Sequence, residues 1–244
     1  MKKTMMHKWI VLLLSFTSVN TAFAFSNLHP VFGIAYGVDN VNLTQNKIIA
    51  LIAPFENTYK SSHRGEASVY NLFVGVESAF QHNIFGQIGL SYYLTNTLTT
   101  KGDILQFNDP SFNNLSYQFK TKNQRILIET KLLFTLKQNL HPYLLAGAGL
   151  AFNRSYGYSE QSLDGASVPM QSSFANHSAT SFSYTVGLGV DVDVSTHVRL
   201  GGSYRYVDLG QAGLGTTASQ SSTQTLNYNH LKTNEFLVQL DYIC

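Results

Sequence analysis

Charged residues recur at odd-numbered positions within segments whose even-numbered positions are mostly apolar. The set contains both signs and comprises Glu77, Arg125, Glu129, Lys131, Asp191, Asp193, Arg199, Arg205 and Asp241. Buried ions must be paired, because an isolated charge in a low dielectric costs far more free energy than it can regain. The set therefore predicts ion pairs that plug and stiffen the interior of the fold. A gated polar path for ions is the alternative.

Two other groups of residues could do chemistry but lack the required spacing. Residues 147–149 and 187–189 each contain two glycines, without the third glycine and following helix of a nucleotide-binding loop. His177 and Ser178 are adjacent, so in a strand they point to opposite faces, and no matched acid and base marks a nucleophile. We therefore expect no enzyme activity and no cofactor, and we expect the glycines to leave room in a narrow interior.

The clearest element that could position these charges is a hairpin over residues 181–210. Even-numbered residues from Phe182 to Val192 are apolar, and serine, threonine, glycine and aspartate lie between them. After a break at residues 195–197 the alternation resumes as far as Tyr206. Successive side chains of a strand point to opposite faces, so the hairpin has one apolar and one polar face. Strands of about 9–11 residues with this pattern are typical of a transmembrane β-barrel.

The rest of the chain repeats this pattern with the same parity. Six more strands are predicted, over residues 30–39, 68–80, 84–95, 124–135, 142–153 and 233–242. Short turns alternate with four long loops, over residues 40–67, 96–123, 154–180 and 209–232. Short periplasmic turns and long extracellular loops are usual in outer-membrane barrels. We predict an all-β, eight-stranded antiparallel up-and-down transmembrane barrel, with even-numbered residues facing lipid and odd-numbered residues facing the lumen.

Histidines could form a metal or pH-sensing cluster, because imidazole titrates near neutrality. Outside the N-terminal segment they are His29, His82, His141 and His197 near the short-turn end, and His63, His177 and His230 in long loops. These positions are spread around the barrel and lack a compact ligand spacing. We therefore expect solvated interface residues and no metal site.

The N-terminal segment has the features of a secretory signal. Three lysines within the first eight residues precede an apolar run over residues 9–16, and Ala22-Phe23-Ala24 follows as a cleavage site. We expect a cleaved signal peptide over residues 1–24 and one barrel domain over residues 25–244. Without the three signal lysines, the 16 Lys and Arg nearly balance the 14 Asp and Glu, which speaks against a nucleic-acid partner. The single cysteine, Cys244, excludes an internal disulfide.

Two motifs and the C-terminal strand point to a known family. Residues 142–149 read PYLLAGAG and residues 202–206 read GSYRY. With these motifs the chain resembles the bacterial outer-membrane β-barrel family, the small eight-stranded porin-like, opacity-protein-like and outer-membrane-protein-A-like barrels. The resemblance implies contact with outer-membrane lipid and lipopolysaccharide, and with the barrel-assembly machinery during insertion. Such proteins usually end in an aromatic residue, whereas this chain ends in Cys244, with Tyr242 two positions earlier.

The unusual length of this chain lies in its loops rather than in its strands. We therefore predict a structural or surface-interaction protein that displays four polar loops to an unidentified envelope, host or environmental partner, and we expect the loops after the first to be mobile. An apolar run in the first loop contains Ile48, Ile49, Leu51, Ile52 and Phe55. Exposed apolar patches often mark partner sites, although the run could equally pack onto the barrel mouth. A narrow porin-like channel for ions or small solutes is the second hypothesis, and a lipid-modifying enzyme is the third.

Overall fold

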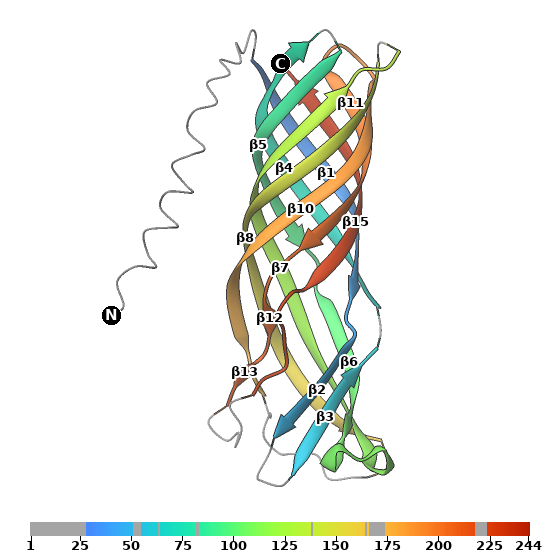
Figure 1. The fold of residues 1–244 in the computed structure, drawn as a ribbon, viewed down its shortest axis with the longest axis vertical. Coiled ribbons are helices and arrows are strands. Elements are labelled where there is room, and N and C mark those ends of the chain that lie inside the picture. Colours follow the sequence, from blue (N-terminus) through green and yellow to red (C-terminus); the bar gives the residue numbers. More distant parts are fainter. Residues whose placement is uncertain are drawn as a thin grey trace, which may run out of the picture.

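The computed structural model describes residues 28–50, 55–62, 64–81, 83–137, 139–163, 165, 174–217 and 224–244. They form an elongated β-barrel with the C-terminus at one end and additional strands at the other (Figure 1). The predicted signal peptide, Leu51, Ile52, His63 and His82 lie outside the described residues. Within the described ranges, no helix has both the length and the apolar character needed to cross a membrane.

Eight antiparallel strands form a closed ring. They are β1 (His29–Asn42), β4 (Arg64–Gln81), β5 (Ile84–Thr95), β7 (Asn113–Phe134), β8 (Leu140–Ser162), β10 (His177–Asp193), β11 (Val198–Asp208) and β15 (Lys232–Ile243). Each strand pairs with the next along this series, and β1 closes the ring on β15 with Phe32 opposite Tyr242. The predicted eight-stranded up-and-down barrel is confirmed.

The predicted division of faces also holds in the described strands. In β1 the pattern alternates from buried Val31 to exposed Phe32 and onward to Val41. Leu188 is 59% exposed and Tyr204 39% exposed, on the face that meets lipid. One irregularity lies in β4, where the register shifts between Ala79 and Gln81. The lipid-facing side of the strands carries little charge, as the hydrocarbon core of a bilayer requires.

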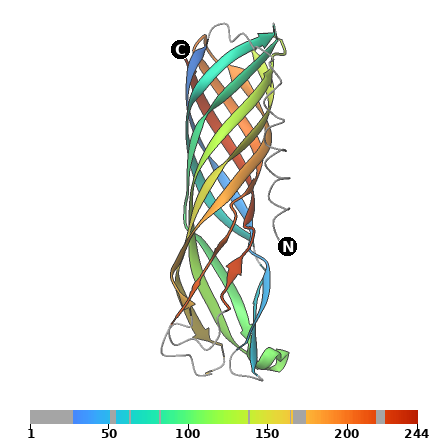
Figure 2. The ribbon, with the colours of Figure 1, turned by 60° about the vertical axis from the view of Figure 1, so that its left-hand side comes forward.

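The strands β7 and β8 extend far beyond the ends predicted for them. They have 22 and 23 residues, and their outer halves continue outside the ring. There β7 pairs with β6 (Leu98–Leu105), which pairs with β3 (Glu56–Ser61), and β3 pairs with β2 (Gln45–Ala50). Figure 2 shows the yellow and green strands continuing below the closed barrel. The prediction of a mobile loop is therefore wrong for residues 98–105 and 113–123, which lie in strands of a sheet.

The physical reason for this extension is visible in the outer half of β7. Inward residues from Leu115 to Thr121 keep the alternation and are buried, while the outward positions from Ser116 to Lys122 are polar. A strand that faces water on its outer side has no apolar stripe there, so the lipid-facing pattern ends before the strand does. Two short 3₁₀ turns, η1 (Gln106–Asn108) and η2 (Pro110–Phe112), join β6 to β7.

Apolar residues fill the interior of the extracellular half in two clusters. The mouth core comprises Val41, Leu43, Ala67, Leu98, Val207, Leu209, Ala212 and Leu231. The loop core comprises Ile49, Tyr59, Ile104, Leu115, Tyr117, Phe119, Phe174, Leu214 and Leu226. Short strands contribute to both: β9 (Phe174–Ala175) pairs with β13 (Gly215–Thr216), and β12 (Ala212–Gly213) pairs with β14 (Asn227–Tyr228). Loop segments therefore fold back against the sheet that lies beyond the ring and contribute residues to its core.

Candidate functional site

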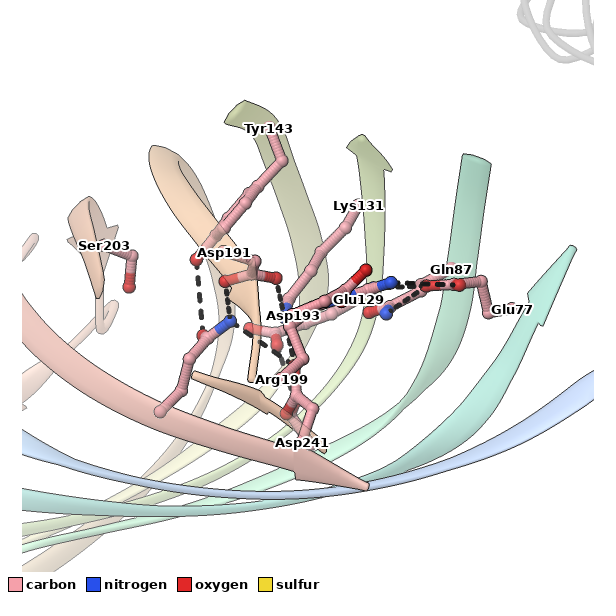
Figure 3. A network of polar contacts seen from close by, with 12 residues as sticks. Glu77, Gln87, Glu129, Lys131, Tyr143, Asp191, Asp193, Arg199, Ser203 and Asp241 are labelled. Carbon is pink, nitrogen blue, oxygen red and sulfur yellow. Dashed lines mark hydrogen bonds and ion pairs between the residues drawn. The ribbon is translucent and has the colours of Figure 1, made fainter. Parts of the chain in front are cut away.

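The lumen network consists of the polar side chains that the ring strands turn inward between the short-turn end and the mouth core. At the short-turn end, Arg199 Nη1 lies 2.7 Å from Glu77 Oε2, and Arg199 Nε lies 2.8 Å from Asp193 Oδ1. Gln87 Nε2 donates to Glu77 Oε2 at 2.7 Å. Figure 3 shows Arg199 beside Asp193 and the Glu77–Gln87 pair. Four strands thus meet through one guanidinium and its partners.

His141 continues this group and differs from the other rim histidines. It is 3% exposed, with Nε2 2.7 Å from Asp193 Oδ2 and Nδ1 3.0 Å from Thr135 Oγ1. The prediction of a solvated residue is wrong here, because β8 begins at Leu140 and the next position faces the lumen. Both ring nitrogens are engaged, so His141 is a buried link between Thr135, which follows β7, and Asp193 of β10.

The next level of the network is centred on Lys131. Its Nζ lies 3.1 Å from Asp241 Oδ2 and 3.7 Å from Asp191 Oδ2. Gln239 Nε2 donates to Asp191 Oδ1 at 2.7 Å, and Tyr143 OH donates to Gln239 Oε1 at 3.3 Å. The close-up in Figure 3 shows Lys131 pointing between the strands that carry Asp191 and Asp241. One ammonium therefore lies between two carboxylates.

Glu129 is held by three donors at the level above. Tyr93 OH and Ser91 Oγ each donate to a Glu129 carboxylate oxygen at 2.6 Å. Arg205 Nη1 forms an ion pair with Glu129 at 3.4 Å and also donates to Tyr93 OH. Gly147 faces this carboxylate, and a Cβ atom there would lie 2.7 Å from Glu129 Cγ. This inward glycine therefore makes room for a packed side chain.

The uppermost ion pair involves a residue outside the predicted set. Arg125 Nη2 lies 2.6 Å from Glu235 Oε2, and both side chains are almost fully buried. Asp39 neighbours Glu235 on β1, is fully buried and accepts a hydrogen bond from Thr233. Glu235 and Asp39 were not included in the candidate set, although both occupy odd positions in predicted strands. Strict alternation was the signal that could have found them.

All nine predicted lumen residues thus lie in the network, and its charge is uneven. Among the described residues, four cations, Arg125, Lys131, Arg199 and Arg205, face seven carboxylates, those of Asp39, Glu77, Glu129, Asp191, Asp193, Glu235 and Asp241. Above them, Asn153 Nδ2 donates to the carbonyls of Leu209 and Gln211 at 2.7 and 2.8 Å. These bonds tie a loop across the top of the polar region, directly below the mouth core.

The apolar residues of the first loop do not all lie on the same side of the sheet. Ile49 is 1% exposed and belongs to the loop core, whereas Ile48 and Phe55 are 48% and 51% exposed. The Phe55 ring lies 5.4 Å from that of Phe107, which lies 5.7 Å from that of Phe112. We call Phe55, Phe107 and Phe112 the aromatic tip. Sequence reasoning missed Phe107 and Phe112, because the Asn- and Pro-containing turn between β6 and β7 has no periodicity.

The turn that carries the aromatic tip has an unusual backbone. Phe107 and Asn108 have φ angles of 57° and 55°, a region that residues other than glycine seldom adopt. Asn57 Oδ1 accepts the Phe107 N–H at 3.2 Å, and Thr58 Oγ1 donates to Asn108 Oδ1 at 2.6 Å. The strand β3 therefore holds this turn in place.

The candidates for other chemistry do not assemble into a site. His177 and Ser178 are exposed at the start of β10, opposite Ser155 and Arg154 of β8. Within the described part of the chain, no group of three or more His, Cys, Asp or Glu residues has a geometry that could hold a metal ion.

A closed ring of eight amphipathic strands with a polar interior defines a transmembrane β-barrel. The family model for the outer membrane protein beta-barrel domain matches residues 9–243. The chain belongs to this family and is an outer-membrane β-barrel protein. No curated protein matches the chain significantly.

Several solved outer-membrane barrels are similar to the chain. Neisserial surface protein A has 15% identity and a TM-score of 0.39, over 89% of this chain and 99% of its own. OprG from Pseudomonas aeruginosa has 13% identity and a TM-score of 0.49, over 88% and 95%. The outer membrane protease OmpT from Escherichia coli has 8% identity and a TM-score of 0.40, over 93% and 99%.

Proposed function

We propose that this protein is a non-enzymatic surface-interaction barrel that contacts an extracellular partner through its aromatic tip. The observation that carries the proposal is the exposure of Phe55, Phe107 and Phe112, which is 51%, 51% and 46%. Phenylalanine rings that are half exposed and packed edge to face form an apolar surface on the side of the barrel that faces the environment. Aromatic residues are enriched in the centres of protein interfaces.

The extracellular sheet gives this tip a rigid support. The loop core packs beneath β3 and β6, and the rings of Tyr59 and Tyr117 lie 5.4 Å apart within it. A partner that binds a preformed surface loses less conformational entropy than one that must order a loop. Ile48 and Phe55 remain available for contact, and Ile49 contributes to the support instead.

Substitution of the tip tests the proposal. We expect the triple variant Phe55→Ser, Phe107→Asn and Phe112→Ser to fold normally, because asparagine tolerates the backbone at position 107. Bacteria displaying it should lose most of the retention that the native protein gives on immobilised matrix proteins or on a hydrophobic surface. Leu163→Ser is the matched control, since Leu163 is an exposed apolar residue that directly follows β8. Unchanged retention of the triple variant would contradict the proposal.

We further propose that the lumen network is a plug that stiffens the barrel. Arg125–Glu235 and Lys131–Asp241 join β7 to β15, and the mouth core lies above them. An eight-stranded barrel is just wide enough for side chains to fill it. Recording from the purified protein in planar bilayers tests this proposal, and we expect no steady conductance. Reproducible single-channel steps would favour the narrow porin-like channel instead.

Export of the chain is the subject of a separate proposal. We propose that residues 1–24 are a signal peptide and that the mature barrel domain begins at Phe25. Mass spectrometry of protein from the outer-membrane fraction should find Phe25 as the first residue. Protein in that fraction that still begins at Met1 would contradict this assignment.

A further inference from the structure

The aromatic tip projects well beyond the membrane in which the barrel sits. Figure 1 shows the turn that carries Phe107 and Phe112 as green coils at the end opposite the C-terminus. The outward residues of β7 are polar from Gln124 to Asn114, so the lipid-facing band ends near Gln124. At about 3.3 Å per residue and a tilt of about 40°, residues 113–123 rise roughly 28 Å above this band. The headgroup layer on each side of a bilayer is only about 5–8 Å thick, so the tip cannot reach the hydrocarbon around its own barrel.

The side chains of the tip offer a partner hydrocarbon and no hydrogen-bonding group. Phe107 lies between Phe55 and Phe112, with edge-to-face ring contacts on both sides. Residues 105–113 contain no tryptophan, tyrosine, arginine or lysine. Tryptophan, tyrosine and arginine dominate the energetic centres of protein–protein interfaces, where their polar groups pair with the partner. The acyl region of a bilayer has no such groups to pair, so rings without a polar atom match it better.

The backbone of the turn already pairs its own N–H groups. Within residues 107–112, four N–H groups have partners, and Pro110 has no N–H group. The bonds are Phe107 N–H to Asn57 Oδ1 at 3.2 Å, Asp109 N–H to Gln106 O at 3.1 Å, Ser111 N–H to Asp109 Oδ1 at 2.8 Å and Phe112 N–H to Asp109 O at 3.0 Å. An unpaired backbone group is costly in hydrocarbon, so this turn is suited to enter a bilayer.

The charges around the tip restrict the kind of bilayer. Residues 48–59 and 102–119, which lead to and from the tip, contain no lysine or arginine. Glu56 is exposed beside Phe55, and Asp109 lies within the turn. Carboxylates at a contact disfavour a surface of the same sign, because like charges repel. A bilayer with zwitterionic headgroups avoids this repulsion.

We infer that the aromatic tip inserts into the zwitterionic surface of an opposing bilayer. The inference rests on the proposed function, since it names the partner that the tip contacts. The three rings enter the acyl region together, because Asn57 and Thr58 of β3 hold the turn in place. No loop has to be ordered on contact, which lowers the entropic cost of insertion.

Flotation with vesicles tests the inference. Nanodiscs that contain the folded barrel are mixed with phosphatidylcholine vesicles and centrifuged in a density gradient. We expect the native protein to float with the vesicles, and Phe112→Ser to lower the partition coefficient about ten-fold through the loss of one buried ring. Val194→Ser is the matched control and should float like the native protein, since Val194 is an exposed apolar residue at the short-turn end. Native protein that stays unbound, or Phe112→Ser that floats as well as the native protein, would overturn the inference.

A tryptophan in the tip reports its depth directly. Trp9, the single tryptophan of the chain, lies in the proposed signal peptide, so the mature barrel has none. The emission of Phe112→Trp should shift to the blue when vesicles are added, and brominated acyl chains in those vesicles should quench it. Gln118→Trp, on the outward side of β7 in a polar groove, is the control and should not respond. Emission of Phe112→Trp that the vesicles leave unchanged would contradict insertion.

Lipid composition and bacterial retention separate this inference from the proposed function. Vesicles that contain equal parts of phosphatidylcholine and phosphatidylserine should bind more weakly than phosphatidylcholine alone, and Glu56→Gln should narrow the difference. Stronger binding of the mixed vesicles would overturn the assignment to a zwitterionic surface. If the triple variant of the tip loses retention on matrix proteins while the native protein ignores the vesicles, the partner is a protein. The proposed function then holds and this inference fails, whereas unchanged retention without flotation contradicts both.

Discussion

Arg125 on β7 and Glu235 on β15 are 110 positions apart in the sequence, and they join across the lumen through Nη2 and Oε2 at 2.6 Å. In the ring, three strands separate β7 from β15 on either side, so these two strands face each other. One side-chain pair therefore spans the interior.

Removal of one member of this pair should destabilise the barrel strongly. Arg125→Met leaves the Glu235 carboxylate buried without its partner, which costs about 3–5 kcal/mol. Urea unfolding of the protein in lipid vesicles measures this free energy. The double variant Arg125→Met, Glu235→Leu should recover most of the loss, because both charges are then absent. A single variant as stable as the native protein would show that the pair does not stabilise the fold.

Tight packing in the lumen predicts different effects at two glycines. A methyl group added at the inward Gly147 would meet Glu129 Cγ at 2.7 Å, whereas at Gly202, which is exposed on the lipid-facing side, the nearest atom lies 3.9 Å away. We expect Gly147→Ala to lower the free energy of unfolding by about 1–3 kcal/mol. Gly202→Ala should be neutral or slightly stabilising. Unfolding in urea, followed by the loss of the fast-migrating band on unheated gels, compares the two. Equal effects on the free energy of unfolding would indicate that the lumen side chains move to accommodate the added methyl group.

The loop core should make the extracellular half sensitive to alkali. Burial raises the pKa of Tyr59 to about 12 from an ordinary value of 10.0. The neutral phenol is the form favoured in the folded protein, so this stabilisation is complete below pH 10 and is lost as the pH rises through 12. The expected loss is about 1.4 kcal/mol for each pH unit in that window.

Tyr59→Phe provides the comparison for the alkaline transition. Absorbance at 295 nm, which reports tyrosinate, should show one fewer late-titrating group in the variant. Its stability should also fall less steeply over the same window. Burial likewise raises the pKa of Tyr117 and Tyr158, so the variant removes only part of the transition. Titration of Tyr59 near pH 10, with no late-titrating group lost in the variant, would contradict the prediction.

The C-terminal strand should influence the rate of insertion. Tyr242 points to the lipid face, 49% exposed, with its ring 6.0 Å from that of His197. We expect Tyr242→Ala to slow folding by the reconstituted assembly machinery. Val238→Ala on the same strand is the control, since Val238 is also exposed. Identical rates for Tyr242→Ala and the native protein would show that the Tyr242 ring does not influence insertion.

Alternation in the sequence predicted the ring strands and their faces, because lipid contact on one side leaves an apolar residue at every second position. The same rule could have added Asp39 and Glu235 to the lumen set. It could not pair Arg125 with Glu235, because that pairing depends on how the ring closes. Ile49 belongs to the loop core because residues 45–50 form a strand, which their mixed composition did not indicate. The contact between Phe55 and Phe107 depends on a backbone turn without sequence periodicity.

The ordered extracellular sheet also determines how the protein is seen from outside the cell. A strand of 22 residues such as β7, at about 3.3 Å per residue, is much longer than the ~30 Å hydrocarbon core that it crosses. Its outer part is a fixed scaffold, so the epitopes on it are conformational and combine residues from β3, β6 and β7. Antibodies raised against the folded barrel should therefore recognise intact cells and fail on heat-denatured protein.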